Sequence, residues 1–258
     1  MEVISGFAPI ITIIEEAYQI PQLGRNRRIS ALLPYNYHES NKSYPVLYLN
    51  DGQNLFNENA PFGNWAIDKE LATLAEAGHS EIIVITIDHG GEDRITEYLP
   101  YFNPKFGKGE GVLYLKFLHE TLIPYVNKTF RTIPDRENTG IGGSSMGGLI
   151  SLFAGLNQQQ VFSKLLIFSP SLWIAPKMFQ QAENFSPNLP MHMYIYSGGK
   201  ESANHLPNVL RFKNRLLRGN PEYHNIDLRV ELNPYGTHSE FYWRHEFPKA
   251  VYWLYFNK

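Results

Sequence analysis

Apolar residues recur along this chain at two spacings, one typical of strands and one typical of helices. The β-rich runs fall at residues 10–14, 28–33, 44–49, 82–87, 137–141, 164–168, 191–196 and 226–232. Apolar residues recur at helical spacing within 65–77, 113–126, 149–156 and 206–217, and an aromatic helical stretch ends the chain. Strand and helix patterns therefore alternate, which predicts an α/β fold with a mostly parallel central sheet and helices on both faces.

The N-terminal runs and one long polar segment depart from this alternation. A turn-like stretch with Pro21 and Gly24 separates the first two β-rich runs, which predicts an antiparallel edge on the N-terminal side of the sheet. Residues 89–110 carry glycines, prolines and aromatics without a clear period, and we expect an irregular, lid-like loop there. Because no repeat, low-complexity segment or linker interrupts the chain, residues 1–258 are predicted to form a single domain.

Composition and charge exclude several classes of function. The 258 residues are 43% hydrophobic, enough for a large core, and the formal net charge is −2 without a run of basic residues. A nucleic-acid partner is therefore not expected. Residues 1–7 lack the basic and apolar regions of an export signal, and no apolar run reaches membrane-spanning length. We therefore expect a soluble, cytoplasmic protein without a membrane partner. The absence of cysteine excludes disulfides and thiolate chemistry.

The segment Gly143-Ser144-Ser145-Met146-Gly147 carries the most specific chemical signal. It fits the pattern G-x-S-x-G, in which a strand turns sharply into a helix and exposes one serine at the apex. A strand pattern precedes the segment and a helical pattern follows it, as this nucleophile elbow requires. Side chains at positions 143 and 147 would collide with neighbouring backbone, which explains the two glycines. Ser145 is the predicted nucleophile, and the alternative is a Gly/Ser loop that joins two core elements.

A serine hydroxyl is a poor nucleophile and needs a histidine base that is oriented by a carboxylate. In this architecture the acid and then the histidine follow the serine, on loops at the carboxyl ends of later strands. His238 lies in the turn after the last predicted strand, where the base is expected. His245 is the alternative, one helical stretch later, whereas His205 lies too early, at the start of a helix. We therefore predict His238 as the base.

The carboxylate of the triad should follow the strand at residues 191–196. Glu201 ends the stretch SGGKE at residues 197–201, and the next carboxylate, Glu222, lies beyond a whole helical pattern. The alternative role for Glu201 is that of a helix cap, because glutamate near a helix start also interacts favourably with the helix dipole. With Glu201 as the acid, the chain has a complete Ser-Glu-His triad.

The oxyanion of the tetrahedral intermediate needs two backbone donors. One comes from the residue after the nucleophile, here Met146, and the other from the loop after an early strand. The stretch NDGQ at residues 50–53 ends the strand at 44–49, and Gly52 allows a close backbone approach, so the Gln53 N–H is the second candidate. Asp-Gly also occurs as an ordinary turn. This chemistry requires neither a metal ion nor an organic cofactor.

Four segments together resemble the putative-esterase family of α/β-hydrolases. They are PVLYLNDGQNLF at residues 45–56, DRITEYLP at 93–100, GSSMGG at 143–148 and GTHS at 236–239. The family includes feruloyl and acetyl-xylan esterases, siderophore esterases and mycolyltransferases. The resemblance implies an α/β-hydrolase fold, Ser145 as nucleophile, Glu201 as acid, His238 as base, and Gln53 and Met146 as oxyanion donors. It implies hydrolysis of a carboxylic ester through an acyl-enzyme, and it leaves the substrate open.

The predicted partner is a small-molecule acyl or aryl ester. Tyr98 and Trp173 lie on loops expected near the serine and are candidates to hold an aromatic or acyl group. Arg94 is a candidate to bind an anionic group, although pairing with Glu97 or Asp88 would instead fix its loop. Two other functions stay open. An acyltransferase of the same fold would admit an acceptor alcohol better than water, and a non-catalytic carbohydrate- or ligand-binding module would be expected to have lost part of the triad.

Overall fold

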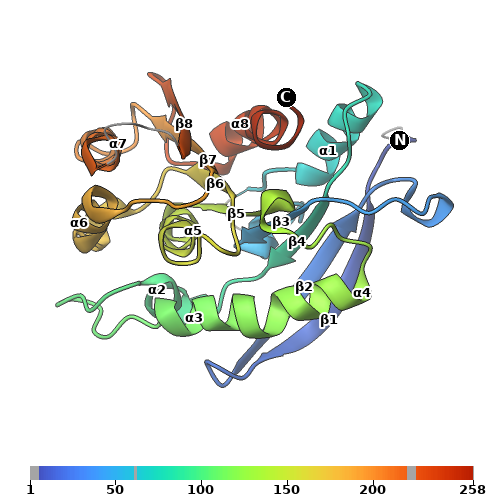
Figure 1. The fold of residues 1–258 in the computed structure, drawn as a ribbon, viewed down its shortest axis with the longest axis horizontal. Coiled ribbons are helices and arrows are strands. Elements are labelled where there is room, and N and C mark those ends of the chain that lie inside the picture. Colours follow the sequence, from blue (N-terminus) through green and yellow to red (C-terminus); the bar gives the residue numbers. More distant parts are fainter. Residues whose placement is uncertain (1–5, 61–62, 220–224, 258) are drawn as a thin grey trace.

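An eight-stranded sheet crosses the molecule in the order β1-β2-β4-β3-β5-β6-β7-β8 (Figure 1). The computed structural model describes residues 6–60, 63–219 and 225–257. The strands are β1 (Ile10–Ile20), β2 (Arg25–Leu33), β3 (Val46–Asn50), β4 (Ile83–Ile87), β5 (Thr139–Ser144), β6 (Lys164–Phe168), β7 (Met191–Gly198) and β8 (Ile226–Asn233). The α-helices are α1 (Ile67–Glu76), α2 (Arg94–Tyr98), α3 (Gly111–Phe117), α4 (Ile123–Thr129), α5 (Ser145–Asn157), α6 (Lys177–Asn184), α7 (His205–Gly219) and α8 (Glu240–Val251).

The pairing of the strands confirms the predicted sheet. β1 pairs antiparallel with β2, and β2 pairs antiparallel with β4, whereas the other neighbours are parallel. The β1–β2 hairpin is longer than its apolar runs suggest, because only residues 21–24 form the turn. All parallel strands end at the same edge of the sheet, so the loops that follow β3, β5, β6, β7 and β8 gather there.

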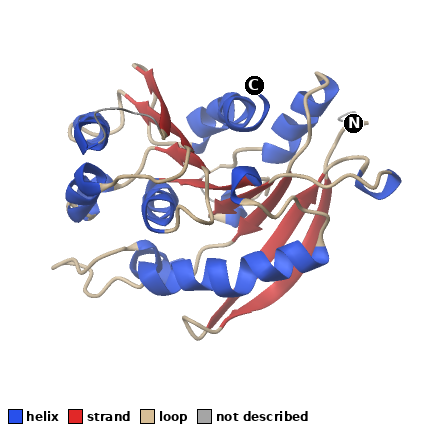
Figure 2. Cartoon of the chain, viewed as in Figure 1, coloured by secondary structure: helices blue, strands red, loops and turns tan. Residues whose placement is uncertain are grey.

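Each central strand contributes alternate side chains to two cores. In β4, Ile83, Ile85 and Ile87 join one apolar cluster, while Val84 joins the other. Helices α3 to α7 supply the first cluster, and α1 and α8 supply the second. Figure 1 shows α1 and α8 on one side of the sheet and α3 and α5 on the other, and Figure 2 shows strands between the two helical layers. The α/β-hydrolase arrangement predicted from the sequence is therefore confirmed.

Two helices were not predicted. Residues 89–110 contain α2 within the segment expected to be irregular, and α6 follows β6. The 89–110 segment is also anchored to the β1–β2 hairpin, because Arg27 Nη2 lies 2.8 Å from Glu97 Oε1 and both side chains are buried. The lid-like loop expected from the sequence is thus attached to the β1–β2 hairpin.

Some expectations fall outside the described residues. The lack of an export signal concerned residues 1–7, of which 1–5 are not described, and Glu222 lies in the undescribed stretch 220–224. Among the helices that are described, none combines the length and the apolar character needed to cross a bilayer.

Candidate active site

A pocket of about 380 Å³ opens at the carboxyl ends of the parallel strands. The segments after β3, β4 and β8, the end of β5 and the first turns of α5 and α8 form its walls. The residues that line it are Asp51, Asn54, His89, Arg94, Ser144, Ser145, His238, Glu240 and Trp243. The structure therefore brings the predicted nucleophile and the predicted base to one cavity.

The nucleophile elbow has the geometry that its sequence predicts. β5 ends at Ser144, α5 begins at Ser145, and Ser145 has a φ of 56°, in the left-handed region that non-glycine residues rarely adopt. A Cβ at Gly143 would lie 2.9 Å from the carbonyl carbon of Gly147, and a Cβ at Gly147 would lie 2.6 Å from Asp51 Oδ2. The predicted collisions at both glycines are thereby confirmed.

The hydroxyl of Ser145 is held by the loop after β6. Ser145 Oγ lies 3.2 Å from Ser171 Oγ, and the Ser171 N–H donates to the Ser145 carbonyl at 3.0 Å. Ser145 and His238 face the same pocket, but these two described residues share no hydrogen bond in this state. Proton transfer between them would therefore need a movement of one of the two side chains.

Glu201 is the hydrogen-bond partner of His238. Its Oε2 lies 2.6 Å from His238 Nδ1, while its Oε1 accepts hydrogen bonds from Ser169 Oγ at 2.6 Å and from the Gly198 N–H at 2.7 Å. Burial by itself would raise the pKa of Glu201, but the hydrogen bonds from His238 and Ser169 and the nearby His205 lower it below its ordinary value. The carboxylate is therefore the favoured form, even though only 2% of its side chain is exposed.

Residues that the sequence analysis did not propose surround this pair. Ser169, at a φ of 45°, accepts a hydrogen bond from Trp243 Nε1 at 2.9 Å, and the Trp243 ring meets His238 edge-on at 4.9 Å. His205, set aside because of its early position, is buried with Nε2 3.1 Å from Glu201 Oε2. Ser169 and Ser171 follow the parallel strand β6. The rule that loops after parallel strands gather at one edge of the sheet, which located Glu201, could therefore have indicated these two serines as well.

The loop after β3 is fixed from two sides. The Gln53 side chain accepts from the His89 N–H at 2.9 Å, and Arg94 Nε and Nη2 contact the two carboxylate oxygens of Asp51 at 2.6 and 2.8 Å. A Cβ at Gly52 would lie 2.6 Å from Asp88 Oδ1, so this position admits only glycine. These contacts fix the loop that carries Gln53, and Asp51 of the same loop lies against the elbow, since a Cβ at Gly147 would lie 2.6 Å from its Oδ2. The Gln53 N–H stays the predicted oxyanion donor.

Two of the proposed substrate-binding residues have roles that the sequence did not indicate. Arg94 lines the pocket, but its partner is Asp51 and not Glu97 or Asp88. Burial would lower the pKa of Arg94, yet the Asp51 carboxylate outweighs that effect and raises it, so the guanidinium stays charged.

Tyr98 requires a correction. Its side chain is fully buried, with its ring edge-on to Tyr114 at 5.1 Å, so it belongs to the core beneath the pocket and does not reach a ligand there. Trp173 lies outside the pocket lining, and 58% of the residue is exposed.

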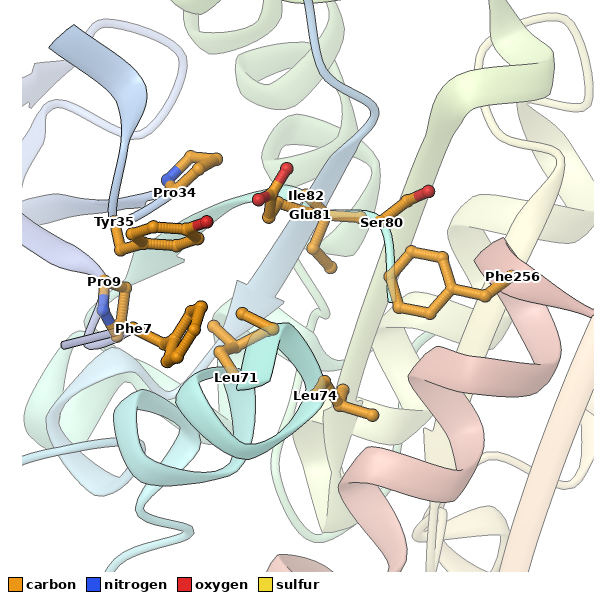
Figure 3. A pocket seen from close by; sticks show the side chains of 11 residues that line it. Phe7, Pro9, Pro34, Tyr35, Leu71, Leu74, Ser80, Glu81, Ile82 and Phe256 are labelled. Atoms are coloured by element: carbon orange, nitrogen blue, oxygen red, sulfur yellow. The ribbon is translucent and has the colours of Figure 1, made fainter. Parts of the chain in front are cut away.

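A second hollow lies at the opposite ends of the strands. Apolar groups from the N-terminal segment, α1 and the C-terminus line it, among them Phe7, Tyr35, Leu71, Leu74 and Phe256 (Figure 3). It holds only about 20 Å³, and its described lining includes no histidine. This hollow therefore offers no candidate base among its described lining residues.

Comparison with known proteins decides the family. A model described as putative esterase matches residues 20–254, which is most of the chain. This chain belongs to the putative-esterase family. Among curated relatives, YbbA of Bacillus subtilis, an uncharacterized protein, is 29% identical over 154 residues, 57% of this chain and 58% of that protein. The chain thus spans little more than half the length of that relative.

Two solved structures share the fold of this putative-esterase family member. An IroE-like serine hydrolase from Shewanella oneidensis has a TM-score of 0.76 at 20% identity, covering 94% of this chain and 79% of its own. A ferulic acid esterase from Anaeromyces mucronatus, in complex with ferulic acid, has a TM-score of 0.71 at 21% identity, covering 97% and 92%. At these identities the likeness establishes the α/β-hydrolase fold.

Proposed function

We propose that this chain is a carboxylic-ester hydrolase that works through an acyl-enzyme on Ser145. The observation that carries the proposal is the 2.6 Å contact between Glu201 Oε2 and His238 Nδ1 on the wall of the pocket that Ser145 also lines. Membership of the putative-esterase family supports the same reaction. The proposed partner is a small-molecule acyl or aryl ester, and the expected compartment is the cytoplasm.

Glu201 sets the state of the base. A carboxylate opposite Nδ1 keeps the proton on that nitrogen, so Nε2 of His238 carries a lone pair and can accept a proton from Ser145. The carboxylate also stabilises the imidazolium that forms during attack. The buried position of Glu201 and its bonds to Ser169 and Gly198 keep it from turning away from the imidazole.

The reaction proceeds in two stages. Ser145 Oγ attacks the ester carbonyl while His238 Nε2 takes the hydroxyl proton, and the N–H groups of Gln53 and Met146 bind the oxyanion. The C–O bond to the alcohol then breaks as His238 returns the proton to it. Water attacks the acyl-enzyme by the same route and releases the acid and free Ser145. No residue proposed here needs a metal ion or cofactor for these steps.

The pocket favours a compact and partly polar substrate. Most of its lining side chains carry charge or hydrogen-bonding groups, and Trp243 supplies an apolar surface beside His238. Trp173 is exposed in the segment after β6 that also carries Ser171, and it is the proposed contact for an aryl or acyl group. The ferulic acid bound by the structural neighbour from Anaeromyces mucronatus makes an aryl ester the first substrate class to test.

Covalent labelling tests the nucleophile. A fluorophosphonate probe is expected to label the wild-type chain and to leave Ser145→Ala unlabelled, with Ser144→Ala as the matched control that still reacts. Ser145→Ala is also expected to lose orders of magnitude in kcat on p-nitrophenyl, feruloyl and acetyl-sugar esters. Wild-type rates in Ser145→Ala would refute the mechanism, and a wild-type chain that hydrolyses none of these esters would refute the substrate class.

A further inference from the structure

The two oxygens of the Glu201 carboxylate contact different kinds of partner. Oε1 is fixed by the hydroxyl of Ser169 and the N–H of Gly198. Oε2 faces two imidazoles, with His238 Nδ1 at 2.6 Å and His205 Nε2 at 3.1 Å. One oxygen is therefore anchored by the protein, while the other is shared between two nitrogens.

His205 Nε2 lacks a well-directed hydrogen bond. The nitrogen is buried, only 6% of the side chain is exposed, and its 3.1 Å contact with Glu201 Oε2 lies off the direction that a hydrogen bond requires. A buried polar atom without a proper partner costs about 1–3 kcal/mol and calls for an explanation.

We propose that Glu201, His205 and His238 form a binding site for Zn²⁺ whose occupation blocks the base. One oxygen and two nitrogens of these residues lie within 4.8 Å of one another. Two histidines and one glutamate are a ligand set that zinc accepts, with a water molecule in the fourth position. The hydrogen bonds to Oε1 are the outer contacts that orient a ligating carboxylate.

Only a small movement is needed to admit the ion. Ligand atoms about 2.1 Å from a tetrahedral zinc ion lie about 3.4 Å apart. The distance from His205 to Oε2 is already close to that value, whereas His238 Nδ1 must retreat from its 2.6 Å contact. His238 can do so because 39% of its side chain is exposed.

Zinc at this position would change the tautomer of the base. A nitrogen that binds zinc carries no proton, so the proton on His238 Nδ1 moves to Nε2 and Glu201 exchanges its hydrogen bond for a bond to the metal. Nε2 then has no lone pair for the Ser145 proton. Inhibition by zinc therefore rests on the proposed hydrolase function, whereas the binding of zinc does not.

Calorimetric titration with Zn²⁺ tests the site without an activity measurement. The wild-type chain is expected to bind one ion, and both His205→Gln and His238→Gln are expected to lose at least tenfold in affinity. His238 is exposed, so its variant folds even where the change at buried His205 does not. His245→Gln is the matched control, because His245 Nδ1 contacts only the Phe241 carbonyl, and it should bind like wild type. Equal affinity of wild type and both ligand variants, or no binding by wild type, would overturn the proposal.

Two further measurements distinguish the binding of zinc from the proposed ester hydrolysis. Ser145→Ala lacks the nucleophile but keeps all three ligands, so it should bind Zn²⁺ as wild type does, and loss of binding there would place the ion elsewhere. Co²⁺ should give the visible absorption of a four-coordinate site in wild type and lose it in His205→Gln. If the chain hydrolyses esters, Zn²⁺ should inhibit it and a chelator should restore the rate. Full activity with the site saturated would overturn the inhibitory role.

Discussion

Ser145 and Ser171 are joined through both backbone and side chain. The Ser171 N–H donates to the Ser145 carbonyl, and the two hydroxyl oxygens lie 3.2 Å apart. The backbone bond fixes the loop after β6 against the elbow, and the hydroxyl contact holds the nucleophile in a rotamer that does not meet His238. In the proposed mechanism, the Ser145 hydroxyl therefore has Ser171 as a second hydrogen-bond partner besides His238.

Ser171→Ala is expected to raise kcat/KM. A hydrogen bond between neutral groups stabilises the resting rotamer by about 1 kcal/mol, and its loss would increase the rate about fivefold. The backbone contact is unaffected by the change. Steady-state kinetics on p-nitrophenyl acetate measure the effect, with Ser163→Ala, a buried serine away from the pocket, as control. A tenfold fall in Ser171→Ala would show instead that this hydroxyl supports the transition state.

Glu201 should contribute to stability in a pH-dependent manner. Its pKa is lowered in the folded chain, so its ionisation stabilises the fold fully above its ordinary value near 4.5, and that contribution is lost as the pH falls through the folded-state pKa. The difference in unfolding free energy between wild type and Glu201→Gln should therefore shrink on going from pH 7 to below pH 4. Urea titrations at several pH values test this. A difference independent of pH would contradict it.

Arg94→Gln should destabilise the chain. The variant leaves the buried carboxylate of Asp51 without its partner, next to Gly147 at the elbow, and breaking such a pair costs about 3 kcal/mol. Asp51→Asn combined with Arg94→Gln should recover part of that loss, because no unpaired charge remains. Chemical denaturation of the single and double variants measures both. A double variant no more stable than Arg94→Gln alone would show that the charge on Asp51 is not the cause.

Glu240 should select substrates by charge. Its carboxylate lines the pocket and forms no ion pair among the described side chains, while the charge of Asp51 is compensated by Arg94. Burial raises the pKa of Glu240, so its charged form is favoured most at the upper end of the assay pH range. Wild type is therefore expected to prefer acetylcholine over O-acetyl-lactate, two acetate esters whose alcohols carry opposite charges.

The change Glu240→Gln should reduce that preference about fivefold, since a charge pair near a wet surface is worth about 1 kcal/mol. The ratio of kcat/KM values for the two esters is the measurement. Glu76→Gln, at an exposed position outside the pocket lining, removes the same charge and serves as the control for net charge. An unchanged ratio in Glu240→Gln would exclude this residue as the source of selectivity.

Local sequence patterns predicted the sheet and the elbow, because both depend on residues that lie close together in the sequence. The continuous apolar run at 82–87 and the paired glycines at 143 and 147 each constrain backbone that is adjacent in sequence. The order of the strands then located the loops that carry Glu201 and His238. These inferences needed only the rule that parallel strands end at one edge of the sheet.

Other features depend on side-chain direction and on distant contacts, which no local pattern contains. Tyr98 turns inward to Tyr114, although its loop forms a wall of the pocket. Arg94 reaches Asp51 across 43 positions instead of an acid close in sequence. His205 was set aside on its place in the chain, yet the first turn of α7 returns it to Glu201. Such pairings follow from the fold and become visible only with it.

The buried pair of Arg27 and Glu97 has a consequence for shortened versions of this protein. The β1–β2 hairpin lies at the edge of the sheet and looks dispensable, since every proposed catalytic group lies after residue 50. Removal of that hairpin would leave the buried Glu97 carboxylate without Arg27. The carboxylate packs tightly against Gly90, since a Cβ at Gly90 would lie 2.9 Å from its oxygens. The same segment carries His89 and Arg94. We therefore expect that an active truncated chain has to begin before Arg25. Shortened versions made for crystallisation or fusion should keep the whole β1–β2 hairpin.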